Sequence, residues 1–267
     1  MGCNKMKFYL FNLIFKTSGL RIGGETDKNV LYFLKYDEMY VIPFSSWKGS
    51  FKRISEYVAK SMKIGSSDKH KDDRHEGYTD NEIEDILQSI KQKGDKIRGE
   101  EIESDKYPNL SSIFSPNNEY SVRDVEDKIR EYIASIKCPI DGLYGSNFFA
   151  SKLTFSDSVF HENGTFLTHV TIDRMKMKAY EEDKGGHLFD EEVLRPQKIE
   201  LKIILRIPNE NELKVWKNTL KFIDTEGLQI GGGKSRGLGM LTLDKESTFD
   251  EIENFNKISY SIKDILK

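Results

Sequence analysis

Residues 198–207 read KIELKIILRI, and their alternation of apolar and polar residues decides the fold class of this chain. A period of two over eight or more residues predicts a β-strand with one buried face and one exposed face. Such a strand needs partner strands beside it and a layer over its apolar face, so the flanking segments define the architecture. The apolar residues on the shared face are Ile199, Leu201, Ile203, Leu205 and Ile207.

The segments on either side of this strand predict the rest of a sheet and two helices. Residues 7–15, KFYLFNLIF, predict a strand buried on both faces, and MLTL at 240–243 predicts a short one. Apolar residues at helical spacing predict a helix after Pro43, with Ser45 or Ser46 as its N-cap, and a second helix over 213–223. The two stripes are Trp47, Phe51, Ile54, Val58 and Met62, then Leu213, Trp216, Leu220 and Ile223.

The order of these elements predicts an α+β fold. Strand, helix, two strands, helix and strand match a ferredoxin-like, RRM-like βαββαβ core, in which two helices cover one face of an antiparallel sheet. The other face of such a sheet is a common platform for RNA. We expect one domain over residues 1–267.

Residues 63–142 predict an acidic helical insertion into this core. The stretch from Gly65 to Asp141 holds 19 acidic and 12 basic residues. It therefore carries a charge of −7, and the remainder of the chain, whose total is −3, carries +4. Helices are expected around 80–92 and 121–136, with a polar loop over 65–77 and a loose segment over 109–118. The net charge is a poor guide to partners, because the insertion masks a basic remainder.

Other bulk features exclude several classes of protein. The longest apolar stretch, near residues 8–15, is too short to span a bilayer, so a cytoplasmic protein without membrane contact is expected. The chain has two cysteines, neither in a C-x-x-C pair, which argues against a disulfide framework or a cysteine zinc site. His70 and His75 lie in the polar loop with no cysteine nearby in the sequence, and no metal site is predicted there.

Residues 228–241, LQIGGGKSRGLGML, form the densest glycine cluster. They do not fit a nucleotide-binding P-loop, because Leu228 stands where its first glycine belongs and because the segment follows a helix and precedes a strand. Two interpretations stay open. The glycines could serve a bent connection, or they could let a phosphate backbone approach main-chain N–H groups, with Lys234 and Arg236 neutralising it.

Five segments together resemble the RAMP superfamily of CRISPR-associated proteins, most closely the backbone subunit of type III effector complexes. Besides the glycine loop they are LRIGG (20–24), YVIPFSSWKGSFKR (40–53), LYGSNFFASKLTFSDS (143–158) and HVTIDRMKMKAYEEDKGGHLFDEEVL (169–194). The resemblance implies partners: CRISPR RNA, target RNA, other effector subunits and further copies of this chain.

The same resemblance implies roles for particular residues. A hairpin thumb over 168–194 would enter the guide–target duplex, with Met175 and Met177 as wedges. Asp27 would cleave target RNA with a divalent metal, Mg²⁺ or Mn²⁺, making the chain a metal-dependent endoribonuclease that is active only in the assembled complex; no metal ligand is assigned. Asn29 and Phe44 depart from the family pattern. The expected RNA-binding residues are Arg21, Ser45, Ser46, Lys48, Arg53, Gly231, Gly232, Gly233, Lys234, Ser235 and Arg236.

Two alternatives accompany this hypothesis. The chain could be a structural or capping RAMP subunit of the same complex, without catalysis. It could also be a stand-alone endoribonuclease that processes CRISPR RNA precursors, although such enzymes often use a histidine that the segment around Asp27 lacks. Asp157, at a predicted strand end, is expected to make a local hydrogen bond rather than to act in catalysis.

Overall fold

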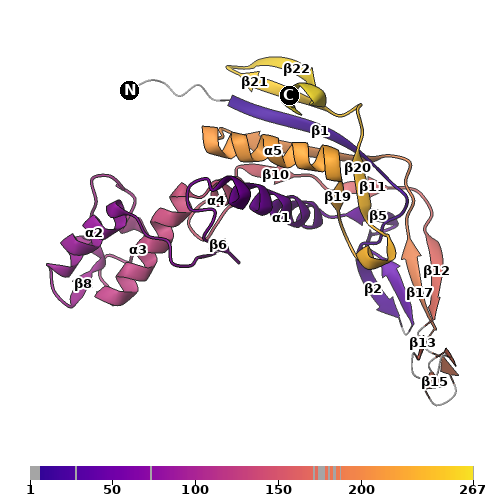
Figure 1. The fold of residues 1–267 in the computed structure, drawn as a ribbon, viewed down its shortest axis with the longest axis horizontal. Coiled ribbons are helices and arrows are strands. Elements are labelled where there is room, and N and C mark those ends of the chain that lie inside the picture. The colour runs from indigo at the N-terminus through magenta and orange to yellow at the C-terminus, as the bar shows by residue number, and fades with distance from the viewer. Residues whose placement is uncertain are drawn as a thin grey trace. The chain divides into compact units, whose positions relative to one another are not determined.

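The structure, a computed structural model, describes residues 7–27, 29–72, 74–170, 172–173, 178–179, 181–182, 185–186 and 188–266. It is a mixed α+β protein with mainly antiparallel sheets (Figure 1). The chain divides into two compact units. The sheet unit comprises Met1–Ile54, Leu153–Ile207 and Lys217–Lys267, and the helical unit comprises Ser55–Lys152 and Pro208–Trp216. The predicted insertion bounds, 63–142, stay a prediction.

The largest sheet has β1 at its centre. Its strands follow the order β10-β18-β1-β20-β19, and β21 also pairs with β1 and then with β22. All of these pairings are antiparallel. The strands are β1 (Lys7–Thr17), β10 (Leu153–Phe155), β18 (Ile199–Arg206), β19 (Leu228–Gln229), β20 (Met240–Leu243), β21 (Thr248–Glu253) and β22 (Asn256–Ser261).

The alternation in residues 199–206 does place one face of β18 in the core. Four apolar residues of β18 are buried and the residues between them are exposed. Ile207 departs from the prediction: it lies after the strand with a φ of 40° and is exposed. The prediction for residues 7–15 was also partly wrong, because β1 is fully buried on one face only. Its buried side chains are Tyr9, Phe11, Leu13 and Phe15.

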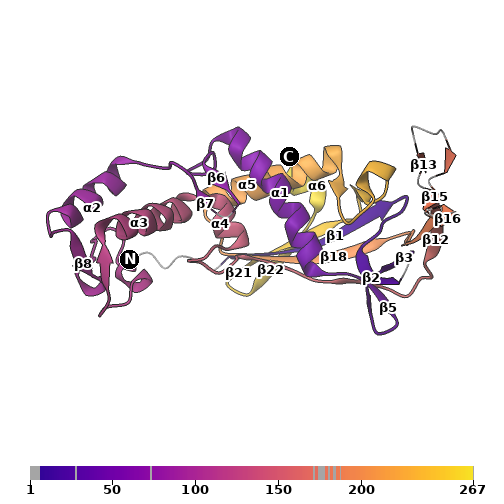
Figure 2. The same cartoon turned by 90° about the horizontal axis from the view of Figure 1, so that it is seen from below.

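Two helices contribute to the sheet unit, α1 (Phe44–Met62) up to Ile54 and α5 (Glu210–Glu226) from Lys217, and these parts lie along the sheet (Figure 1 and Figure 2). The ring of Trp47 stacks on Phe15 at 5.5 Å between centroids, so the start of α1 packs on β1. Trp47, Leu220 and Ile223 are fully buried, as the predicted helical stripes require. The short helix α6 (Ile262–Leu266) follows β22.

Two smaller sheets complete the sheet unit. One has the order β11-β5-β4, from β4 (Lys35–Tyr36), β5 (Met39–Ile42) and β11 (Ser158–Phe160). The other has the order β12-β17-β3-β2, from β2 (Gly23–Asp27), β3 (Val30–Phe33), β12 (Thr165–Val170) and β17 (Leu188–Val193). Beyond β12, short strands pair as β13 (Ile172–Asp173) with β14 (Lys178–Ala179) and β15 (Glu181–Glu182) with β16 (Gly185–Gly186).

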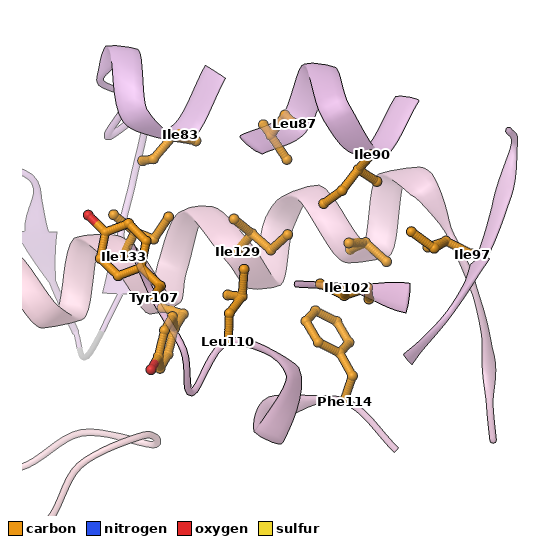
Figure 3. Close-up of a cluster of buried hydrophobic side chains, with 12 residues drawn as sticks. Ile83, Leu87, Ile90, Ile97, Ile102, Tyr107, Leu110, Phe114, Ile129 and Ile133 are labelled. Carbon is orange, nitrogen blue, oxygen red and sulfur yellow. The ribbon is translucent and has the colours of Figure 1, made fainter. Parts of the chain in front are cut away.

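The helical unit has its own apolar core (Figure 3). Ile83, Leu87 and Ile90 of α2 (Asn81–Lys91) lie over Ile129 and Ile133 of α3 (Val122–Lys137). The predicted helices are thus confirmed to within a residue or two. The other elements are β6 (His70–Lys71), β7 (Arg74–His75), β8 (Lys96–Arg98), η1 (Gly99–Glu101), η2 (Ser111–Ile113), β9 (Glu119–Ser121) and α4 (Pro139–Tyr144).

Two segments expected to be loose are ordered parts of this unit. Residues 109–118 contain η2, and Leu110 and Phe114 on either side of it are buried in the core. The polar loop 65–77 contains the β6–β7 hairpin, in which both histidines are buried. A few apolar or ring side chains hold each segment in place. The polar composition of the segment as a whole does not reveal them. Among the described residues, no helix combines the length and the apolar character needed to cross a membrane.

Candidate functional site

The glycine loop joins β19 to β20 through a tight turn. Four of its glycines, Gly231, Gly233, Gly237 and Gly239, have φ angles between 68° and 82°. Gly233 and Gly237 flank the short helix η3 (Lys234–Arg236), and the N–H of Arg236 donates to the carbonyl of Gly233 at 2.8 Å. Positive φ is strained for residues with a Cβ, so the turn depends on glycine at these positions.

Close contacts with the protein's own main chain require glycine at two of these positions. A Cβ on Gly231 would lie 2.0 Å from the carbonyl oxygen of Arg21, and one on Gly239 would lie 2.0 Å from that of Ile230. The N–H of Gly232 donates to the Arg21 carbonyl at 2.8 Å, which ties the loop to residues 20–24. A Cβ on Gly237 would meet nothing within 4 Å. The glycines therefore bring the LRIGG segment and the glycine loop together.

Two arginines, one from the glycine loop and one from the LRIGG segment, contact the same buried carboxylate. Arg236 places Nη2 at 2.9 Å from both oxygens of Glu191, and Nε of Arg21 lies 3.2 Å from Oε1. Nε2 of His169 lies 2.9 Å from Oε2 of the same residue. The side chain of Glu191 is fully buried, so these partners offset the cost of burying its charge. We name Arg21, His169, Glu191 and Arg236 the Glu191 network.

Sequence analysis missed Glu191, although a signal was present. In the strand LFDEEV, Glu191 shares a face with Phe189 and Val193, and alternation therefore places it toward the interior. A carboxylate at an inward position implies a buried cationic partner. His169, on the neighbouring strand β12, is one partner of this carboxylate. The ring of His169 also stacks on Phe189 at 4.9 Å between centroids.

The two cations of the glycine loop differ in their availability to a ligand. The side chain of Arg236 is engaged by Glu191 and is 42% exposed. Lys234 and Ser235 are exposed, and within the part of the chain that the structure describes Lys234 makes no ion pair. Lys234 is therefore the loop cation that can reach an anionic ligand without breaking an internal contact.

The start of α1 holds four more of the predicted RNA-binding residues. Ser45 and Arg53 are exposed and Ser46 and Lys48 are half-buried. Neither Lys48 nor Arg53 forms an ion pair with another described residue. Among the described residues, no hydrogen bond or ion pair joins this helix start to the glycine loop, so they are separate parts of the predicted interface.

The cap of α1 differs from the prediction. The helix begins at Phe44, and the N–H of Phe44 donates to Oδ1 of Asp157 at 2.6 Å. The carboxylate of Asp157 thus supplies the capping acceptor from a distant segment, in place of Ser45 or Ser46. Asp157 was predicted to make a local hydrogen bond, and this was wrong in its range, because the bond reaches Phe44, 113 residues away in the sequence.

Asp27 lies at the end of β2 and is exposed. Its Cα pairs with Val30 on β3, Val30 pairs with Asp190 on β17, and Asp190 pairs with Thr168 on β12. Asp27 therefore sits at the end of the sheet from which β12 and β17 continue toward β13 and β15 (Figure 1). Within the described residues, Asp27 belongs to no group of three or more potential metal ligands. Met175 and Met177 lie outside the described residues.

Comparison with known proteins identifies the family of this chain. A sequence model of the RAMP superfamily matches residues 13–242, which span both the glycine loop and the LRIGG segment. No match was found among curated proteins. The match covers most of the chain, and the chain therefore belongs to the RAMP superfamily. Membership indicates a CRISPR-associated protein that binds RNA.

Proposed function

We propose that this RAMP superfamily protein is a backbone subunit of a type III CRISPR effector complex and holds the guide RNA through its glycine loop. The observation that carries the proposal is the exposed Lys234, which stands on a turn built around left-handed glycines and tied to Arg21. A phosphate backbone that meets this turn finds a free lysine and the edge of Arg236. Other effector subunits and further copies of this chain are the proposed partners.

The strand order supports a ferredoxin-like core for this role. The order β10-β18-β1-β20 is antiparallel throughout. One helix, α1, falls between β1 and β10 in the chain, and α5 falls between β18 and β20. We take this order as support for a βαββαβ core. The paired β12 and β17, with the small strands beyond them, form the proposed thumb over 168–194.

As a more specific part of the proposal, we assign target cleavage to Asp27. Mg²⁺ and Mn²⁺ are often held by one or two carboxylates together with phosphate oxygens of the substrate. The exposed Asp27 fits this pattern, because RNA would have to supply the remaining ligands. A bound ion would polarise the scissile phosphate. Asp27 would position it near the proposed thumb, because Asp27 is linked through Val30 and Asp190 to Thr168 across the sheet.

The alternatives keep one supporting observation each. A structural or capping subunit without catalysis is favoured because, among the described residues, Asp27 belongs to no group of three or more potential metal ligands. A stand-alone precursor-processing enzyme would need an available histidine for acid–base chemistry. His169 is engaged by Glu191 and Phe189, so among the described histidines the exposed His161 would have to serve.

RNA binding can be tested directly with the full-length protein. Fluorescence anisotropy with a labelled single-stranded guide RNA, repeated over a range of salt concentrations, reports the affinity and its salt slope. Lys234→Ala should weaken binding and reduce the slope by about 0.7, since one phosphate contact is lost. Lys245→Ala, an exposed lysine beyond the far end of β20, provides the matched control. If Lys234→Ala and Lys245→Ala bind alike at every salt concentration, the glycine-loop assignment is wrong.

A further inference from the structure

The helical unit brings four metal-ligating side chains to one point. Nδ1 of His70 lies 3.4 Å from Nε2 of His75, 3.7 Å from Sγ of Cys138 and 3.5 Å from Oδ1 of Asp141. One ligand atom from each residue falls within 4.8 Å of every other, and all four residues are buried. No metal site was predicted here because no cysteine lies close to these histidines in the sequence, but the fold brings one into contact. Cys138 is 68 residues away in the sequence but in contact in the fold.

Secondary structure places all four ligands. His70 and His75 are Cα partners in the β6–β7 hairpin, so both rings project from the same end of a short ladder. Cys138 stands between α3 and α4 as the residue that ends one helix and precedes the other. Asp141 lies in the first turn of α4. The sequence signature is therefore H-x4-H followed far downstream by C-x2-D.

Hydrogen bonding alone does not explain this convergence. A single imidazole nitrogen can donate or accept one hydrogen bond, yet Nδ1 of His70 faces a nitrogen, a sulfur and an oxygen at once. The three separations match the edges of a tetrahedron around Zn²⁺, which are about 3.3–3.8 Å for bonds to nitrogen, oxygen and sulfur. We propose that His70, His75, Cys138 and Asp141 bind a zinc ion.

The surroundings of the four ligands resemble the outer shell of a metal site. Nδ1 of His75 lies 3.0 Å from Oε1 of Glu131, which leaves Nε2 to face the cluster. The hydroxyl of Ser135 donates to the second oxygen of Asp141. Nε2 of His70 is buried without a hydrogen bond and lies 3.5 Å from Glu56. Carboxylates behind metal-bound histidines orient the rings and strengthen them as ligands.

The types of ligand favour zinc, and the number of protein ligands indicates a structural role for the ion. Two imidazoles, one thiolate and one carboxylate suit a borderline ion with tetrahedral preference. Four protein ligands leave no open position, so the ion is structural. It would fasten the β6–β7 hairpin to the α3–α4 junction.

Metal analysis of the purified full-length protein tests this site. Elemental analysis should find one zinc per chain, and the ion should return after removal with a chelator and titration with Zn²⁺ alone. Cobalt substitution should give a thiolate-to-metal charge-transfer band. Cys138→Ser should abolish this band, while Cys3→Ser, which removes the other cysteine, should keep it. A wild-type protein that takes up no zinc, or a band that survives in Cys138→Ser, would overturn the proposal.

A milder variant covers the case in which Cys138→Ser fails to fold. Glu131→Gln keeps all four ligands but weakens the support behind His75, so zinc affinity should fall about 10- to 100-fold. Zinc should also raise the Tm of the chelator-treated wild type more than that of Glu131→Gln at the same low zinc concentration. An equal affinity in the two proteins would contradict the assigned arrangement. His161→Gln, an exposed histidine in the sheet unit, is the control for nonspecific histidine binding.

Discussion

Nη2 of Arg236 lies 2.9 Å from each carboxylate oxygen of Glu191, so the second cation of the glycine loop is held by a side chain buried in β17. The same carboxylate faces Arg21, whose carbonyl accepts a hydrogen bond from Gly232. Glu191 thus joins two of the segments that carry the proposed RNA contacts. The position of Arg236 is set by the protein before any ligand arrives, which reduces the ordering cost of binding.

Substitution of Glu191 should therefore destabilise the protein. Glu191→Gln keeps the size of the side chain but leaves Arg21 without a nearby negative charge, and the loss should be about 3 kcal/mol. Urea denaturation of the purified protein measures it. Glu200→Gln, at an exposed position paired with a surface lysine, should change stability by less than about 0.5 kcal/mol. Equal stabilities for Glu191→Gln and Glu200→Gln would show that the Glu191 network contributes nothing.

The two glycines around Leu238 should differ in their tolerance of alanine. Gly237→Ala adds a Cβ in open space and should cost about 1–2 kcal/mol, because the residue keeps a left-handed backbone. Gly239→Ala should cost more, since its Cβ would lie 2.0 Å from the carbonyl of Ile230 and force β19 from β20. Chemical denaturation orders the two variants. The reverse order would mean that the loop is not packed as described.

Stability of the helical unit should fall in acid through Glu82. Hydrogen bonds from Lys106, then Lys137 and Tyr107, lower the pKa of Glu82 from 4.5 to about 2. A depressed pKa in the folded state means that the contribution is complete above 4.5 and is lost as the pH falls toward about 2. Glu82→Gln should therefore be less stable than wild type at neutral pH, and the gap should close over this window.

Urea midpoints measured across that pH range give the comparison. Glu103→Gln is the control, because Glu103 is exposed and makes no ion pair among the described residues. A gap between wild type and Glu82→Gln that stays constant down to the acid limit would exclude Glu82 as a source of the pH dependence.

Cleavage of target RNA should depend on Asp27 if the finer part of the proposed function is correct. Asp27→Asn in a reconstituted complex should slow metal-dependent cleavage by about 100-fold or more and leave guide-RNA binding intact, since the change removes a metal-positioning charge. Glu25→Gln, on the same exposed edge of β2, should cleave normally. Equal cleavage by both variants would favour the structural or capping alternative.

Local patterns in the sequence were sufficient for the elements of the core. The stripe of Trp47 and Phe51 and the alternation from Ile199 to Leu205 depend only on helical or strand geometry. The burial of each position can therefore be predicted from its near neighbours in the sequence. Where these predictions failed, as at Ile207 and on the second face of β1, the end of a strand or the absence of a second covering layer decided the exposure.

Composition misled the interpretation of the insertion. The polar segment 65–77 was expected to be a loop, yet its two histidines are buried in a hairpin. An average over neighbouring residues cannot anticipate this burial, because the residues that contact His70 lie far along the chain, in α4 and just before it. The prediction for the cap of α1 was wrong for the same reason. The capping acceptor is Asp157, 113 residues from Phe44, and not one of the adjacent serines.

The sequence by itself determined the α+β class, the two core helices, the family and the glycine loop, because each depends on neighbouring residues or on ordered motifs. Only the tertiary structure decided which charged groups meet. Arg236 and Glu191 are 45 residues apart and Cys138 and His70 are 68 apart. Burial of a charge or a thiol demands a partner but does not specify which one. Chain topology makes that choice, and both the anchored arginine and the proposed zinc site follow from it.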